Sequence, residues 1–353
     1  MGSNVPLRLA VAIAASALIV APAIAPARAV RPVSVIADAR MPVRMSVDTQ
    51  QGQAQFPLYV SADWNAPQPA VQRAVIIVHG RLRNADTYFR TAQHARELAG
   101  VDPAATLLVA PQFLATADVS AHHAPGDLLS WRGNAWMAGA DAASGVPVSS
   151  YAVLDDIARH LADRRLFPNL KTIVFVGHSG GAQVLQRYAI VSHADALAAE
   201  GIDVRFVVAS PSSYAYFDAQ RPDANGAPAA FDASRCADFD RWKYGMENRP
   251  ASIAGSTPAQ LEADYVKRRI VYLAGGNDDD PASASLDNSC AARAQGAQRV
   301  ARAQGFYRYL QTRHPGGLNQ TFHVVPGVGH DGARMLTSSC ALAAMFDTAG
   351  CAP

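Results

Sequence analysis

The sequence contains few charged residues for its length. Asp, Glu, Lys and Arg make up 17% of its 353 residues, and the formal net charge at pH 7 is +2. Nucleic-acid-binding proteins gather Lys and Arg into a stripe that faces the phosphate backbone, and no such stripe occurs here. We therefore expect no nucleic-acid partner. Half of the residues are hydrophobic, which is enough to bury the core of one large domain.

The apolar run near the start of the chain is too short to cross a membrane. Leu9–Val20 has 12 residues, whereas a spanning helix needs about 20. Arg8 precedes the run, and Ala27-Arg28-Ala29 matches the A-x-A pattern of a signal-peptide cleavage site. We expect residues 1–29 to be a cleaved signal peptide and residues 30–353 to form a single domain. The mature protein is then secreted or periplasmic, with no stable membrane insertion.

Cysteine is also scarce, with Cys236, Cys290, Cys340 and Cys351 as the four examples. No C-x-x-C pair is present and none of the four is close to a histidine in sequence, so the spacing does not predict a metal site. In an exported protein an even number of cysteines is expected to form disulfides, and four allow three pairings. The short separation of Cys340 and Cys351 favours that pair, with Cys236–Cys290 as the other, although the other pairings stay open.

Short, continuous apolar runs recur along the chain and are typical of strands covered on both faces. These runs are Arg73–Gly80, Ala105–Phe113, Lys171–Ser179, Val204–Ser212, Arg269–Asp278 and Thr321–His330. Ahead of them, Val33–Ala62 alternates loosely and contains prolines, which suits antiparallel strands at the edge of a sheet.

Stretches with helical spacing alternate with these strands, at Asp86–Leu98, Ser149–Arg165, Gly181–Ala199, Cys290–Arg313 and Asp331–Phe346. This order predicts an α/β fold with a doubly wound, mostly parallel central sheet and helices on both faces. In such sheets ligands bind beyond the carboxyl ends of the strands.

Two long segments interrupt the alternation, at Thr116–Pro147 and Tyr214–Leu261. Loops of this length in a compact domain usually have a functional role, so we expect them to form walls or a partial lid of a site. Their aromatic residues Trp131, Trp136 and Tyr214, together with Tyr88, are candidates for a substrate pocket. The alternative is that these rings anchor the loops to the body of the domain.

The segment Gly177-His178-Ser179-Gly180-Gly181 matches G-x-S-x-G, between an apolar strand and a helical stretch. A nucleophile at such a strand-to-helix turn sits in a strained conformation, and its small neighbours let the hydroxyl project above the sheet. A reactive serine also needs a base and a carboxylate that orients it.

Candidates for both partners follow Ser179 in the order serine, acid, histidine. We expect the acid to be Asp278, directly after the strand at 269–278, with Asp279 as the alternative. We expect the base to be His330, in a glycine-rich loop after the last strand. The backbone N–H groups of Gly180 and Arg81 are the candidates for an oxyanion hole.

Taken together, His79-Gly80, the segment at 177–181, Asp278 and His330 resemble the α/β-hydrolase family, in its secreted serine hydrolase and esterase branch. The stretches 242–250 and 289–309 are similar to uncharacterised bacterial and fungal members. The resemblance implies an eight-stranded, mostly parallel sheet, a Ser-His-Asp triad, no cofactor and hydrolysis of an acyl bond, while the cysteine spacing gives no reason to expect a metal.

The function predicted on this basis is cleavage of a small-molecule or polymeric carboxylic ester through an acyl-enzyme. The same triad would also suit a secreted peptidase or amidase, and a non-catalytic binding protein can retain this fold. The sequence leaves the oligomeric state open.

Overall fold

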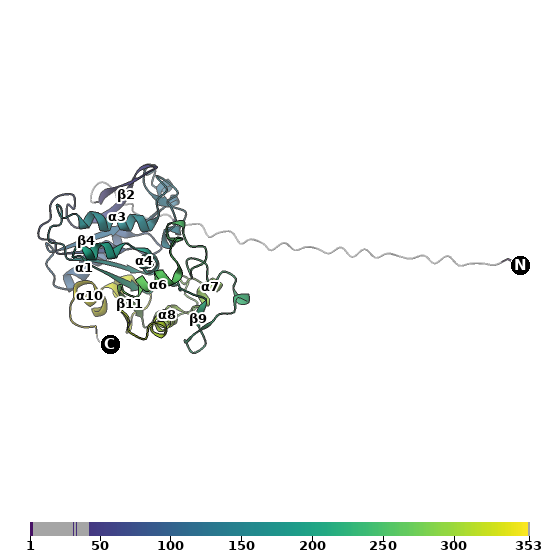
Figure 1. Ribbon diagram of the computed structural model, residues 1–353. Coiled ribbons are helices and arrows are strands. Elements are labelled where there is room, and N and C mark those ends of the chain that lie inside the picture. The colour runs from purple at the N-terminus through teal and green to yellow at the C-terminus, as the bar shows by residue number, and fades with distance from the viewer. Residues whose placement is uncertain (3–30, 32, 34–41, 352–353) are drawn as a thin grey trace. The chain divides into compact units, whose positions relative to one another are not determined.

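The computed structural model describes residues 1–2, 31, 33 and 42–351 (Figure 1). Apart from its first two residues, the predicted signal peptide lies outside this part. The described chain contains an eight-stranded sheet in the order β1-β2-β4-β3-β7-β8-β11-β12. Its strands are β1 (Pro42–Thr49), β2 (Gly52–Val60), β3 (Arg73–Val78), β4 (Thr106–Pro111), β7 (Thr172–His178), β8 (Asp203–Ala209), β11 (Arg269–Gly275) and β12 (Gln320–Val325).

From β4 to β12 every neighbouring pair of strands is parallel. β1 and β2 pair antiparallel with each other, and β2 pairs antiparallel with β4. This arrangement confirms the mostly parallel sheet predicted from the apolar runs. It also confirms antiparallel strands at one edge, within the predicted stretch 33–62.

Each inner strand is buried on both faces because its side chains alternate between two hydrophobic cores. In β3, Ala74, Ile76 and Val78 point into one core. Val75 and Ile77 point into the other. Full burial of a residue of this size contributes about 1.5–3 kcal/mol, so a continuous apolar run is favoured over an alternating one.

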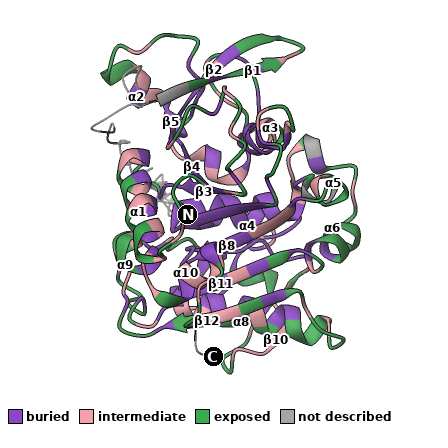
Figure 2. Ribbon diagram, turned by 90° about the vertical axis from the view of Figure 1, so that its left-hand side faces the viewer, coloured by how far each residue is buried: buried purple, intermediate pink, exposed green. Residues whose placement is uncertain are grey.

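Helices cover both faces of the sheet (Figure 2). On one face lie α1 (Ala85–Leu98), α9 (Gly332–Leu336) and α10 (Ser339–Phe346). On the other lie α3 (Ser150–Ala162), α4 (Gly180–Val191), α6 (Pro258–Tyr265) and α8 (Arg299–Arg313). In α1 the buried residues Ala85, Phe89, Ala92 and Ala95 recur every three or four positions, which places them on the face toward the sheet.

Three helices predicted as continuous are each divided in two. The stretch 181–199 forms α4 and α5 (Ala194–Ala199), 290–313 forms α7 (Cys290–Arg293) and α8, and 331–346 forms α9 and α10. New helix starts explain two of the breaks, because the side chains of Gln298 and Ser338 accept hydrogen bonds from backbone N–H groups of α8 and α10. Helical spacing alone does not reveal such internal caps.

Both predicted insertions are present and contain little regular structure. The first holds α2 (Thr116–Ala121), the 3₁₀ helix η1 (Ala135–Ala138) and β6 (Ser130–Trp131), which pairs with β5 (Leu114–Ala115). The second holds the short antiparallel pair β9 (Gln220–Pro222) and β10 (Pro228–Ala230), with η2 (Ala233–Arg235) and η3 (Ala251–Ile253).

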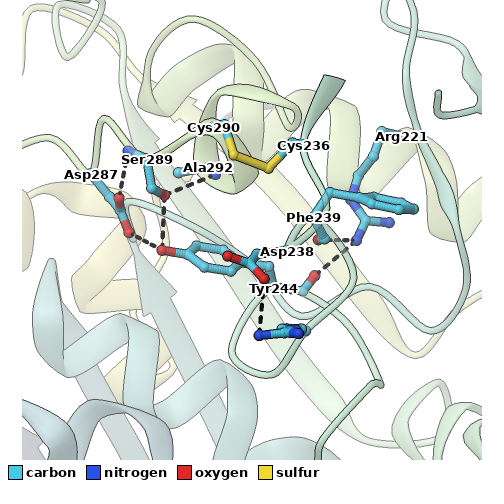
Figure 3. The surroundings of a disulfide bond; sticks show 10 residues. Arg221, Cys236, Asp238, Phe239, Tyr244, Asp287, Ser289, Cys290 and Ala292 are labelled. Carbon is cyan, nitrogen blue, oxygen red and sulfur yellow. Dashed lines mark hydrogen bonds and ion pairs between the residues drawn. A yellow bond between two sulfur atoms is a disulfide. The ribbon is translucent and has the colours of Figure 1, made fainter. Parts of the chain in front are cut away.

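Two disulfides join Cys236 to Cys290 and Cys340 to Cys351, which is the favoured pairing. The first connects the second insertion to α7 (Figure 3). Beside it, the hydroxyl of Tyr244 donates to Asp287 over 2.8 Å. None of the helices in the described residues combines the length and apolar character needed to span a membrane.

Candidate active site

Ser179 occupies the turn between β7 and α4. Its backbone has φ 58° and ψ −114°, a conformation that costs a non-glycine residue about 1–3 kcal/mol. The surrounding chain holds it there: the N–H of Ser179 donates to the carbonyl of Ala209 in β8 over 2.9 Å. The turn also needs a glycine two positions later, because a Cβ on Gly181 would lie 2.1 Å from the carbonyl oxygen of Val78.

The structure brings together the three residues proposed from the sequence. His330 Nε2 lies 2.9 Å from Ser179 Oγ, and His330 Nδ1 lies 2.8 Å from Asp278 Oδ2. A carboxylate can only accept, so Nδ1 carries the proton and Nε2 has a free lone pair toward the serine. Asp278 is buried and makes this contact, whereas the side chain of Asp279 is exposed.

The second oxygen of Asp278 contacts a buried cation. Asp278 Oδ1 accepts from Arg299 Nη1 over 3.0 Å, and neither side chain has more than 3% of its surface exposed. Burial on its own would raise the pKa of Asp278, but the hydrogen bond from His330 and the charges of His330 and Arg299 outweigh it and lower that pKa. The carboxylate is therefore ionised at neutral pH.

The loop after β3 approaches the first residue of α4 closely. A Cβ on Gly180 would lie 2.7 Å from the backbone nitrogen of Arg81 and 2.8 Å from Met137 Sδ. As the first residue of α4, Gly180 has an N–H with no acceptor inside the helix. The backbone nitrogen of Arg81, proposed for the oxyanion hole, thus lies close to Gly180, the residue after Ser179.

His79 stabilises this loop as a neutral residue. Its Nδ1 lies 2.8 Å from the carbonyl oxygen of Gly80, and its Nε2 accepts from the N–H of Phe113 over 2.9 Å. Burial lowers the pKa of His79 to about 4, so the ring keeps one donor and one acceptor at neutral pH.

A further buried histidine, His178, packs against the ring of His330. The ring of His178 is 4.6 Å from that of His330, and its Nδ1 is 3.2 Å from the hydroxyl of Tyr88. Burial lowers the pKa of His178 to about 3, so it adds no positive charge beside His330 at neutral pH. Tyr88, proposed for the pocket, is half-buried and contacts the site through His178.

The other three aromatic candidates are fully buried in the hydrophobic core. Trp131 donates from Nε1 to the carbonyl of Ala140, and Tyr214 stacks on Phe306. Trp136 stacks on Phe113, 5.1 Å between ring centroids. Because these rings have no exposed surface, they anchor the insertions to the domain, which corrects the expectation that they face a substrate.

The structure adds residues that sequence reasoning missed. Arg299 contacts the acid, Met137 lies against Gly180, and a buried ion pair of 2.7 Å between Arg83 and Asp118 ties the loop carrying Arg81 to the first insertion. None belongs to a short motif, because each contact joins segments far apart in the chain.

One group of possible metal ligands comprises His323, Cys340 and Cys351. The two sulfur atoms are joined in a disulfide, so they offer no thiolate to a metal ion.

The sheet order and the turn at Ser179 between β7 and α4 define the α/β-hydrolase fold. Comparison with solved structures agrees with this. The chain is similar to the poly(3-hydroxybutyrate) depolymerase LpqC from Bordetella parapertussis, with 20% identity, a TM-score of 0.59 and coverage of 87% of this chain and 90% of that one. It is also similar to poly(aspartic acid) hydrolase-1 from Sphingomonas sp. KT-1, with 18% identity, a TM-score of 0.56 and coverage of 84% and 95%. No protein-family model matches the sequence, and no curated protein matches it.

Proposed function

We propose that this protein is a secreted serine hydrolase that cleaves a carboxylic ester through an acyl-enzyme. The observation that carries the proposal is the hydrogen-bonded series from Ser179 through His330 to Asp278, with distances of 2.9 and 2.8 Å. These are the contacts that a nucleophile, a general base and an orienting carboxylate require.

In the first half of the reaction, Ser179 Oγ attacks the ester carbonyl carbon as its proton passes to His330 Nε2. The carbonyl oxygen becomes an oxyanion that accepts from the N–H groups of Gly180 and Arg81. Asp278 holds the ring orientation and stabilises the imidazolium. The C–O bond to the alcohol then breaks, and the proton on Nε2 moves to the leaving oxygen.

In the second half, water takes the place of the alcohol. His330 removes a proton from the water, the hydroxide attacks the acyl carbon, and the bond to Ser179 Oγ breaks as that oxygen recovers the proton. The products are a carboxylic acid and an alcohol, and the protein returns to its starting state. An ester is favoured over an amide because an alkoxide is a better leaving group than an amide anion, so its departure depends less on protonation by His330.

Export is part of the proposal and rests on residues 1–29 of the sequence, with support from the disulfides. Both disulfides in the described chain suit an oxidising compartment. Substrates of both small and polymeric kinds belong in the test set, including poly(3-hydroxybutyrate) and poly(aspartic acid), the polymers named for the two structural neighbours.

The test is covalent labelling with a fluorophosphonate probe, together with turnover of p-nitrophenyl esters of increasing chain length and of a p-nitroanilide. The wild-type protein is expected to be labelled and to hydrolyse the esters faster than the anilide. Ser179→Ala should lose both activities, whereas Ser120→Ala, at an exposed position in α2, should retain them. Equal turnover by Ser179→Ala and wild type would refute the proposal.

A further inference from the structure

Arg299 lies directly behind the carboxylate of Asp278 and is itself almost completely buried. It begins α8, and 1% of its side chain is exposed. Its three guanidinium nitrogens contact three different segments: Nη1 donates to Asp278 Oδ1 over 3.0 Å, Nε to Ser212 Oγ over 3.2 Å, and Nη2 to Ser285 Oγ over 3.0 Å. These three contacts hold the guanidinium in one position beside Asp278.

These contacts restrict how Asp278 can turn. A charge-assisted hydrogen bond from Arg299 occupies Oδ1, which leaves Oδ2 to accept from His330. If the carboxylate rotated, it would break both bonds in a site where water cannot easily replace them. Orientation of His330 thus depends on a residue that does not touch it.

The charge of Arg299 acts on the same series of residues. Burial lowers the pKa of Arg299, and the negative charge of Asp278 offsets part of that effect, so the two form a buried ion pair. A carboxylate that already faces a cation attracts a second positive charge less strongly. Arg299 therefore offsets part of the negative charge that Asp278 presents to His330.

The other titratable groups near His330 are either neutral or exposed, so they affect its electrostatic environment less than Asp278 and Arg299 do. His178, from the turn before α4, is neutral because it is buried, and Tyr88 of α1 is a neutral phenol whose pKa burial raises. Asp331, next in sequence to His330, and Arg81 are charged but exposed, so water and salt screen them.

We propose that Arg299 is a positioning residue of the active site, which pins Asp278 toward His330 and extends the activity of the histidine as a base to lower pH. This inference rests on the proposed serine hydrolase function. It assigns no catalytic contact to Arg299, because the guanidinium acts through Asp278.

The experiment measures the pH dependence of the rate at which a fluorophosphonate probe labels Ser179, and of kcat/KM for p-nitrophenyl acetate. Arg299→Gln removes the charge and keeps a donor. Its activity is expected to fall on the acid side at a pH about 1 unit higher than in the wild type, because the carboxylate now holds the imidazolium more strongly. Arg299→Lys keeps the charge but loses the three-way contact, so its acid limb should stay in place while its maximal rate falls about tenfold.

Arg302→Gln provides the matched control. Arg302 is one turn along α8 and fully buried, but it donates to the backbone carbonyls of Gly296, Asp287 and Ser212 rather than to Asp278. This variant should lose stability without moving the acid limb, which separates the effect of the charge beside Asp278 from the general effect of removing a buried arginine.

A folded Arg299→Gln protein with the acid limb of the wild type would overturn the inference. If that variant does not fold, Arg299→Lys decides the question, since an acid limb that moves upward despite the retained charge contradicts the proposed mechanism. Absence of labelling in the wild-type protein would instead refute the serine hydrolase function, so the two failures are distinguishable.

Discussion

Substitution of Asp278 by Asn is expected to affect activity and stability together, because each oxygen of this carboxylate has a different partner. Oδ2 accepts from His330, and Oδ1 accepts from the buried Arg299. Asn keeps the size and shape of the side chain but removes the negative charge. The ring of His330 then loses the acceptor that selects its productive tautomer, and Arg299 is left in the interior without a counter-ion.

The two losses have different magnitudes. Loss of the orienting carboxylate is expected to lower kcat by about 10⁴-fold. A buried charge left without its partner costs about 3–5 kcal/mol in the free energy of unfolding. For a domain of this size that corresponds to a fall in Tm of about 5–8 °C.

The assay combines ester turnover with thermal unfolding followed by circular dichroism. Asp279→Asn serves as the control, since its exposed side chain should change stability by no more than about 0.5 kcal/mol and leave turnover close to that of the wild type. The double variant Asp278→Asn/Arg299→Gln removes both buried charges. It should therefore recover much of the lost stability while remaining inactive.

Two results would refute this reasoning. Wild-type turnover in Asp278→Asn, with a loss in Asp279→Asn, would show that the acid is wrongly assigned. An inactive Asp278→Asn variant with an unchanged Tm would show that the ion pair with Arg299 contributes nothing to stability.

Three further predictions concern other parts of the domain. In Gly180→Ala, the new Cβ would lie 2.7 Å from the backbone nitrogen of Arg81, so ester kcat/KM should fall about 100- to 1,000-fold; full turnover would contradict the placement of the oxyanion hole. Burial lowers the pKa of His79 to about 4 and that of His178 to about 3, while both titrate near 6.5 in the unfolded chain. The unfolded chain therefore takes up these protons first as the pH falls below about 6.5, and the free energy of unfolding decreases by up to about 2 kcal/mol for each histidine at pH 5. Urea unfolding that gives equal free energies at pH 7 and pH 5 would contradict this prediction. Finally, replacing the disulfide Cys236–Cys290, which spans 54 residues, by two serines should cost about 4 kcal/mol, measured by denaturant unfolding, and a loss below about 1 kcal/mol would contradict the loop-entropy argument.

The sequence predicted best those strands and turns that are determined by residues close together in the chain. Continuous apolar runs such as Lys171–Ser179 predict buried parallel strands because no polar position faces water on either side. The turn at Ser179 is visible because tight packing against Val78 requires glycine two residues later. Helical spacing does not predict the breaks within helices, because it continues across the point where a capping side chain such as Ser338 begins a new helix.

The sequence by itself predicted where the three candidate catalytic residues lie relative to the strands. The serine is on the turn after a central strand, the acid follows a later strand and the histidine follows the last one, so that each lies at the carboxyl end of a strand. Only the tertiary structure decided that Asp278 rather than Asp279 contacts His330, and that Arg299 forms an ion pair with Asp278. It also decided that Trp131 and Tyr214 are core residues. The physical reason is distance along the chain. Hydrophobic pattern and turn chemistry act over a few residues, whereas a buried ion pair depends on where two remote segments pack, and no short pattern records that.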